Sequence, residues 1–183
     1  MPMEVTRAAL PDVLIIKPRV FEDERGRFFE SYNQRELEAR AGIHAAFVQD
    51  NQSRSRKNVL RGLHYQNPQP QGKLIRVLAG EIFDVVVDIR RGSPAFGKWH
   101  GIRLSAENHL TVWVPSGFAH GFLVLSDYAD VLYKTTDYYA PRDEHCILWS
   151  DPQLAIAWPL TGQPELSPKD RRGKLLEDAK VFA

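Results

Sequence analysis

Short apolar runs, each ended within a few residues by glycine, proline or another turn residue, recur along most of this 183-residue chain. Many short strands separated by such turns favour a sandwich or a jelly roll. Two neighbouring runs, 73–79 and 81–89, are separated only by Gly80 and predict a hairpin. The other predicted strands cover residues 13–16, 28–32, 99–104, 110–114, 118–125 and 131–136. With no internal repeat and no linker, the sequence predicts one mainly β domain over residues 1–183.

Two short helices are expected to flank the strands. Asn33 can cap a helix that runs to Arg40, because Glu36 stands three positions later, where a capping box needs it. Ser167 can cap a second helix, whose first position holds proline. Asp170 then falls in the first turn, where the helix dipole favours a carboxylate.

The charge balance excludes whole classes of partner. Lys plus Arg total 24 and Asp plus Glu total 23, so the net charge is only +1 and no broad positive field attracts nucleic acid. The basic run 54–57 lacks interleaved aromatic residues and is interpreted as a solvated loop. No apolar run approaches the roughly 18 residues of a membrane span, and no signal peptide is recognisable. We therefore expect a cytoplasmic protein without nucleic-acid or membrane partners.

The single cysteine, Cys146, cannot form an internal disulfide and has no cysteine partner for a zinc cluster. The neighbouring His145 would point to the opposite face of a strand, so a pair of thiolate and imidazole is not expected. Motifs for nucleophiles and nucleotides, such as Gly-x-Ser-x-Gly, the P-loop and Gly-x-Gly-x-x-Gly, do not occur in the sequence. Cys146 is therefore interpreted as a small packing residue.

The first stretch that could carry chemistry runs from Arg61 through His64 to Lys73 and is interrupted by glycines. A site for an anionic substrate with a general base needs residue types of this kind. In the alternative interpretation, Arg61 and Lys73 are solvated surface charges and His64 is an incidental loop residue. The spacing alone does not decide between the two.

A second stretch, 114–121, resembles the second motif of cupin jelly rolls, in which a strand meets a Pro-x-Gly turn and the next strand carries a histidine. Here that histidine is His120. The first motif of metal-binding cupins has His-x-His, but Tyr65 and Gln66 follow His64. Two lone histidines are fewer than the three protein ligands usual for a catalytic metal. We therefore predict a cupin barrel without metal, in which His120 is either a polar contact in the barrel mouth or a satisfied core residue.

Longer matches, in order, run through the whole chain. They lie at residues 18–21, 23–30, 47–51, 58–64, 71–73, 115–121, 132–134 and 167–170. On these matches the chain resembles the dTDP-4-dehydrorhamnose 3,5-epimerase family essentially from end to end. Tyr65 stands where phenylalanine is expected, which is a mild departure. The resemblance implies a metal-free cupin-type jelly roll with short flanking helices, a homodimer and no cofactor.

The resemblance also implies an activity and a set of site residues. The substrate would be dTDP-4-dehydro-6-deoxy-D-glucose and the product dTDP-4-dehydro-β-L-rhamnose, in dTDP-L-rhamnose biosynthesis. The base maps onto His64, its carboxylate partner onto Asp170, and the proton donor onto Tyr133, which composition alone would interpret as a packing residue. Lys73 maps onto the residue beside the developing enolate. Contacts to the nucleotide sugar map onto Arg25, Glu30, Gln49, Asn51, Arg61, His120, Tyr139, Glu144 and Lys169, with Tyr139 stacked on thymine.

These residue types suit that chemistry. Carbons 3 and 5 both flank the ketone at carbon 4, so removal of either proton places charge on one oxygen, which a fixed cation such as Lys73 can stabilise. An imidazole held by a carboxylate is a suitable base near neutral pH. Inversion also needs an acid on the other face of the sugar. Tyr133 is the candidate at carbon 5, while solvent could serve at carbon 3. No hydride moves, so no nicotinamide is required.

Three other functions stay open at this point. A mono-epimerase of the same family would invert only carbon 3 or carbon 5 of another deoxysugar. A cupin that only binds a nucleotide sugar would not need His64, Lys73, Tyr133 and Asp170 together, so their joint presence disfavours it. A metal-dependent cupin dioxygenase is disfavoured by the ligand count.

Overall fold

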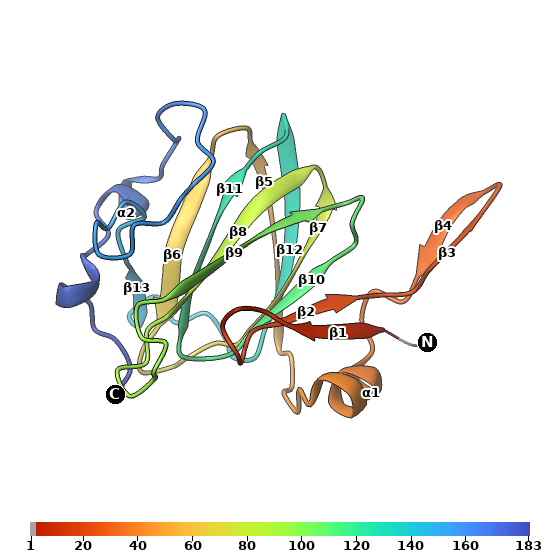
Figure 1. Cartoon of the computed structure of the whole chain (residues 1–183), viewed down its shortest axis with the longest axis horizontal. Coiled ribbons are helices and arrows are strands. Elements are labelled where there is room, and N and C mark those ends of the chain that lie inside the picture. The colour runs from red at the N-terminus through yellow and green to blue at the C-terminus, as the bar shows by residue number, and fades with distance from the viewer. Residues whose placement is uncertain (1–2) are drawn as a thin grey trace.

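The computed structural model describes residues 3–183, and its body is built on two antiparallel sheets that face one another (Figure 1). The six-stranded sheet has the order β1 (Glu4–Arg7), β2 (Leu14–Lys17), β10 (Thr111–Val114), β7 (Lys73–Ala79), β12 (Tyr128–Thr135) and β5 (Gln49–Arg56). The five-stranded sheet has the order β13 (Glu144–Cys146), β6 (Leu60–Gln66), β11 (Phe118–Val124), β8 (Glu81–Asp88) and β9 (Trp99–Ser105). A separate two-stranded sheet contains β3 (Val20–Asp23) and β4 (Gly26–Phe29). The predicted mainly β fold, a cupin-type jelly roll, is confirmed.

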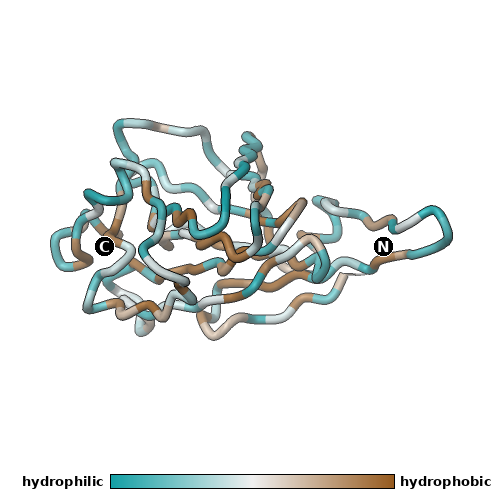
Figure 2. Tube along the Cα trace, turned by 90° about the horizontal axis from the view of Figure 1, so that it is seen from above, coloured by the Kyte–Doolittle hydropathy of each residue, from teal (hydrophilic) through white to brown (hydrophobic). Residues whose placement is uncertain are grey.

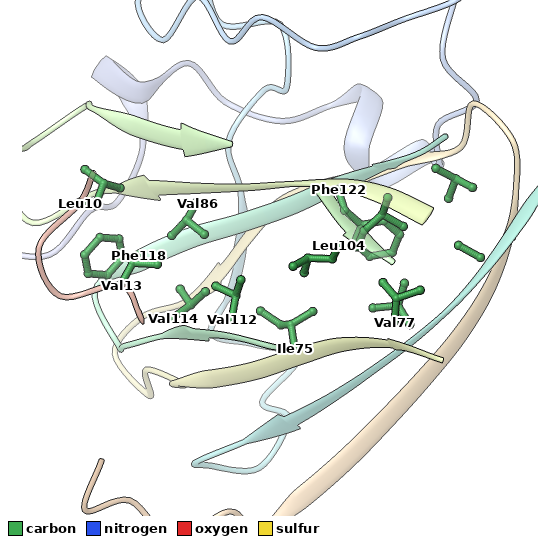
Figure 3. Packing of buried hydrophobic residues seen from close by; sticks show 14 residues of the cluster. Leu10, Val13, Ile75, Val77, Val86, Leu104, Val112, Val114, Phe118 and Phe122 are labelled. Atoms are coloured by element: carbon green, nitrogen blue, oxygen red, sulfur yellow. The ribbon is translucent and has the colours of Figure 1, made fainter. Parts of the chain in front are cut away.

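Apolar side chains from both large sheets fill the space between them (Figure 3). Ile75 and Val77 come from β7, Val86 from β8, and Phe118 and Phe122 from β11, and all five are buried. Removing a side chain of this size from water stabilises the folded state by roughly 1.5–3 kcal/mol. This interior therefore holds the two sheets against each other.

The predicted strands 73–79 and 81–89 are present as β7 and β8, but the predicted hairpin between them is wrong. β7 pairs with β10 and β12 in one sheet, whereas β8 pairs with β9 and β11 in the other. Gly80 passes the chain between the sheets at φ +76°, a conformation that glycine adopts without strain. A Cβ atom there would lie 2.0 Å from the carbonyl oxygen of Tyr128. One glycine between two β-branched runs thus marks a change of sheet here.

The apolar pattern does not predict β1, β3, β5, β6 or β13. The basic run 54–57, interpreted from the sequence as a solvated loop, lies mostly within β5. Arg54 Nε donates to Asp130 Oδ1 of the neighbouring strand β12 over 2.8 Å, so this run belongs to the sheet. The predicted strand 28–32 ends early, because β4 stops at Phe29.

Both predicted helix starts are confirmed. Glu36 N donates to Asn33 Oδ1 over 3.2 Å at the start of α1 (Gln34–Glu36), which continues as a π-helical turn over Leu37–Ala41. The Glu36 carboxylate accepts from Arg40 Nε (2.6 Å) and does not complete the predicted capping box. Ser167 caps α2 (Pro168–Arg171), and a 3₁₀ turn follows at Leu176–Asp178. No helix within residues 3–183 is long and apolar enough to span a lipid bilayer.

Strands β3 and β4 form a hairpin that projects beyond β1 and β2, away from the two large sheets (Figure 1). Its tip holds Arg25, whose guanidinium pairs with Asp23 and whose side chain is 89% exposed. Phe28 of β4 is 67% exposed. Elsewhere, apolar segments gather in the body of the molecule and loop tips are polar (Figure 2). The hairpin therefore exposes an aromatic ring and an arginine outside the core of its own chain.

Candidate active site

A cavity of about 350 Å³ lies between the two large sheets. Phe122 belongs to the apolar core and also lines this cavity, so the cavity begins where the core ends. Its walls come from both sheets. The lining residues that the sequence singles out are Gln49, Asn51, Arg61, His64, Lys73, His120, Tyr133, Tyr139, Glu144 and Lys169.

His64 of β6 is hydrogen-bonded to the buried carboxylate of Asp170 in α2, with His64 Nε2 and Asp170 Oδ1 2.6 Å apart. Burial alone would raise the pKa of Asp170. The hydrogen bonds from His64, Ser167 and Gly62, together with the His64 charge, outweigh it and lower this pKa to about 2. Asp170 is therefore ionised and can only accept, so the proton sits on His64 Nε2. In the neutral imidazole the lone pair is then on Nδ1, which is the basic atom.

The local sequence explains why the carboxylate of Asp170 reaches His64. Ser167 Oγ donates to Asp170 Oδ2 over 2.6 Å while it accepts from the Asp170 N–H, so the helix cap itself orients the carboxylate. The backbone N–H of Gly62 donates to Asp170 Oδ1 over 3.2 Å. Gly62 has φ +124°, and a Cβ atom there would lie 2.5 Å from the Cα of Gly121. Glycine therefore permits the close approach of β6 and β11 beside His64.

Lys73, the first residue of β7, places a buried cation on the cavity wall. Its side chain is 7% exposed, and none of the ion pairs formed within residues 3–183 includes it. Burial lowers the pKa of Lys73 to about 8, although the charge of Glu144 acts in the opposite direction. An unpaired ammonium in such surroundings interacts strongly with any negative charge that develops beside it.

Tyr133 of β12 lines the same cavity but comes from the sheet opposite His64. The strand register sets Thr135 across from Lys73, which makes Tyr133 and Lys73 diagonal neighbours on one face of the six-stranded sheet. Burial raises the pKa of Tyr133, opposed in part by the charge of Arg61, so the phenol keeps its proton at neutral pH. Tyr133 also packs against the main core, as composition suggests.

A continuous hydrogen-bonded chain joins five of the predicted contact residues. Gln49 Nε2 donates to Asn51 Oδ1 (2.8 Å), and the Tyr139 N–H donates to Gln49 Oε1 (3.0 Å). The Tyr139 hydroxyl donates to Glu144 Oε2 (2.8 Å), and the Lys169 ammonium donates to Glu144 Oε1 (2.6 Å). Burial would raise the pKa of Glu144, but the bonds from Lys169 and Tyr139 lower it. Because Tyr139 is 51% exposed, its ring remains available for stacking.

His120 of β11 combines the two roles that the sequence leaves open. It lines the cavity, yet it is buried and hydrogen-bonded through Nε2 to Oδ2 of the fully buried Asp84 over 2.6 Å. The register of β6 and β11 pairs His120 directly with His64. The two histidines at the cupin-like positions are thus each bound to an aspartate of their own.

Arg25 and Glu30 are not brought to this cavity within the chain. Arg25 lies at the tip of the β3–β4 hairpin, paired with Asp23. Glu30 follows β4 and accepts from Asn33 Nδ2 over 2.5 Å in a separate small hollow. Their contact with substrate stays a prediction.

The cavity has lining residues that the sequence does not single out as site residues, namely Ser53, Tyr65, Gln66, Gln71 and Phe122. Ser53 continues the spacing of two begun by Gln49 and Asn51 along β5, and Phe122 stands two positions after His120 on β11. Alternation along a strand would identify both. For Ser53 the signal requires a strand that the polar sequence of β5 does not reveal.

Cys146 of β13 lies beside the His64–Asp170 pair, with its Sγ 3.9 Å from Asp170 Oδ1. Burial, followed by the charge of Asp170, raises the pKa of this thiol to about 12. Within residues 3–183, His64, Cys146 and Asp170 form a group whose possible metal-ligand atoms all lie within 4.8 Å of one another. The sequence analysis, which interprets Cys146 as a small packing residue, does not predict that it lies beside His64 and Asp170. The expected absence of a metal stays a prediction.

Comparison with known proteins gives matches over nearly the whole chain. The family model described as dTDP-4-dehydrorhamnose 3,5-epimerase matches residues 7–178. A curated relative of that name from Pseudomonas aeruginosa is 62% identical over 180 residues, which cover 98% of this chain and 99% of the relative.

Two solved structures are also similar. A dTDP-6-deoxy-D-glucose-3,5-epimerase from Legionella pneumophila, in complex with dTDP-4-keto-L-rhamnose, has a TM-score of 0.94 and 56% identity, covering 96% of this chain and 94% of that chain. A 3'-monoepimerase from Streptomyces bikiniensis, in complex with dTDP-quinovose, has a TM-score of 0.88 and 34% identity, covering 93% and 87%.

The buried ammonium of Lys73 predicts a pH-dependent cost to folding. An unfolded chain holds this proton up to the ordinary lysine pKa of 10.5, whereas the folded protein releases it near 8, so the contribution of Lys73 to stability rises with pH between these values. We expect Lys73→Met to have a higher free energy of unfolding than the wild type at pH 7. The difference between the two proteins should fall by roughly 3 kcal/mol as the pH rises to 10. Urea denaturation from pH 7 to 10 measures this difference. The exposed Lys17→Met is the control, and a constant difference for Lys73→Met would contradict the assignment.

Proposed function

The chain belongs to the dTDP-4-dehydrorhamnose 3,5-epimerase family and is an isomerase, and from this we propose that it epimerises dTDP-4-dehydro-6-deoxy-D-glucose with His64 as the base and Tyr133 as an acid. The product is dTDP-4-dehydro-β-L-rhamnose, for dTDP-L-rhamnose biosynthesis. One observation carries these roles: the two side chains line one cavity from opposite sheets. Inversion requires a proton to leave one face of a carbon and arrive at the other, which this arrangement permits.

His64 removes the proton through Nδ1, because Nε2 is committed to Asp170. Once Nδ1 is protonated, the imidazolium is stabilised by the adjacent carboxylate, as in other pairs of histidine and aspartate. The electrons of the broken C–H bond move onto the oxygen at carbon 4, giving an enolate. The ammonium of Lys73 stabilises that oxygen, and one such donor is worth about 3 kcal/mol.

Tyr133 returns a proton to carbon 5 from the side opposite His64. Its raised pKa keeps the phenol protonated until the enolate needs it. One proton leaves and one arrives, with no net transfer of electrons. The reaction therefore balances without an oxidant, a reductant or a nicotinamide.

The rest of the cavity suits a nucleoside diphosphate. Arg61 Nε is held by Ser55 Oγ over 3.0 Å, which directs the guanidinium on β6, and planar guanidinium groups bind phosphate through two nitrogens. Lys169 adds a second cation at the rim. The exposed ring of Tyr139 offers a surface on which thymine stacks, and Gln49 fixes the backbone of that tyrosine.

A second candidate function is inversion at one carbon only, because the Streptomyces bikiniensis structure of similar fold is named a 3'-monoepimerase. The double reaction is favoured because the matching family model and the curated relatives are named 3,5-epimerases.

Turnover of the dTDP-keto sugar in deuterated water tests the function. We expect deuterium at carbons 3 and 5 of the product. Deuterium at one carbon would support the mono-epimerase, and none at either would leave only a binding protein.

The same assay tests the roles of individual residues. We expect His64→Ala to lower exchange at both carbons by roughly 10²–10⁴-fold while the affinity for dTDP is kept. Tyr133→Phe should retain proton loss at carbon 5 but impair inversion there. Exchange in His64→Ala near the wild-type rate would remove His64 from the base role, and equal effects of Tyr133→Phe on proton loss and inversion would remove Tyr133 from the acid role.

We also propose that the protein is a cytoplasmic homodimer, whose single domain spans residues 1–183. The β3–β4 hairpin supports the dimer, because it carries Arg25 and an exposed Phe28 away from the sheets of its own chain (Figure 1). A second copy could receive this hairpin at its cavity and so complete the predicted substrate contacts of Arg25 and Glu30. Cys146, as a free thiol, is compatible with a reducing compartment.

Mixing two inactive variants tests whether the hairpin serves the partner. Arg25→Ala and His64→Ala should each be strongly impaired alone. In a hybrid dimer, the chain with intact His64 would receive intact Arg25 from its partner, so random re-pairing should restore about a quarter of wild-type activity. The matched control pairs His64→Ala with Tyr133→Phe, both in the cavity of their own chain, and should restore none. Failure of the first mixture to recover activity would contradict the shared site.

A further inference from the structure

Cys146 lies beside the His64–Asp170 pair, and the proposed mechanism does not use its thiol. The strand register places Cys146 of β13 directly opposite His64 of β6. Its Sγ lies 3.9 Å from Asp170 Oδ1, to which His64 Nε2 is bound over 2.6 Å. Three separate elements thus bring a thiol, an imidazole and a carboxylate to one point.

These three donor types are the ones that zinc prefers. Zinc bonds to nitrogen and oxygen are about 2.0–2.2 Å long and bonds to sulfur about 2.3 Å, so neighbouring ligand atoms at a tetrahedral ion lie roughly 3.3–3.6 Å apart. The two separations to Asp170 Oδ1, 2.6 and 3.9 Å, bracket that range, and the third, between His64 Nε2 and Cys146 Sγ, is at most 4.8 Å. Side-chain shifts below about 1 Å would therefore accommodate an ion, with its fourth position left for water.

The ion can reach this point without crossing the substrate cavity. His64 lines the cavity of about 350 Å³, whereas Cys146 lines a neighbouring hollow of about 220 Å³. Asp170, which is only 2% exposed, is hydrogen-bonded to His64 and lies beside Cys146. The cluster is thus accessible from the hollow on the Cys146 side.

We propose that His64, Cys146 and Asp170 form an inhibitory binding site for Zn²⁺ or another thiophilic divalent cation. The ion replaces the hydrogen bond between His64 Nε2 and Asp170 Oδ1, taking both atoms and the sulfur as ligands. Cys146 gives up its thiol proton to solvent as it binds the metal. The imidazole stays neutral, but its proton moves from Nε2 to Nδ1. Binding therefore releases one proton in total. The proton that moves to Nδ1 occupies the atom that acts as the base in the proposed mechanism, so His64 can no longer accept a proton from the substrate.

The position of the ion predicts the kind of inhibition. Since the metal lies on the side of His64 that faces away from the substrate, it should lower kcat while leaving KM and the affinity for dTDP unchanged. This effect on rate rests on the proposed role of His64. Metal binding itself does not depend on that role, so a spectroscopic measurement of binding tests the metal site separately from the role of His64 as the base.

Cobalt(II) substitution tests the site independently of activity. We expect Co²⁺ to give the charge-transfer absorption of a thiolate–cobalt bond in the wild type, to lose it in Cys146→Ser, and to be displaced by Zn²⁺. His145→Asn, which removes the neighbouring imidazole on the same strand, is the matched control and should keep the absorption. If the wild type shows no such band, or if the band survives in Cys146→Ser, the proposed site is wrong.

Zinc titration of the turnover reaction tests the inhibition. Cys146→Ser should keep the basal rate and raise the zinc concentration for half-inhibition by roughly 10-fold or more, whereas His145→Asn should not change it. Mg²⁺ should not inhibit, because it prefers oxygen ligands. Inhibition that competes with dTDP, or that is equal in the wild type and Cys146→Ser, would place the ion elsewhere. A cobalt band without any loss of rate would support the metal site but contradict the role of His64.

Discussion

The hydrogen bond between His64 and Asp170 is the interaction on which the rest of the site depends. A carboxylate as buried as Asp170 is costly unless its oxygens are satisfied. Here they accept from Ser167 at the start of α2, from the backbone of Gly62 in β6, and from His64 itself. The contacts that make the buried charge tolerable also fix which nitrogen of the imidazole is basic. Folding and the proposed function therefore use the same atoms.

The jelly roll supplies the second requirement, which is access to a sugar from two sides. His64 and His120 belong to the five-stranded sheet, and Lys73 and Tyr133 to the six-stranded sheet. A substrate held between the sheets would have the proposed base on one side and the proposed cation and acid on the other. The histidines at the cupin-like positions each bind an aspartate, so both are held in place by the protein itself.

Local signals in the sequence predict those parts of the structure that are determined by residues close together in the sequence. The Ser167 cap and the β-branched runs of β7 and β8 are examples, because capping and strand propensity act within a few positions. The wrong hairpin at Gly80 could not be avoided in this way, since the partners of β7 and β8 are strands that follow later in the chain, β10 and β12 for β7, and β9 and β11 for β8. The polar strand β5 also escapes detection, because its alternating side chains face the cavity instead of the apolar core.

The site residues also divide into those that the sequence identifies and those that depend on long-range strand pairing. The family resemblance finds His64, Lys73 and Tyr133, and the structure brings all three to one cavity. The position of Cys146 beside Asp170 depends on the pairing of β13 with β6, which no local pattern encodes.

Nitrogen-15 NMR of histidine-labelled protein tests the central claim most directly, with His64 assigned by comparison with a variant lacking it. In the neutral imidazole of His64, we predict a protonated Nε2, its proton strongly deshielded by the carboxylate of Asp170, and an unprotonated Nδ1. A spectrum in which Nδ1 carries the proton and Nε2 does not would contradict the account.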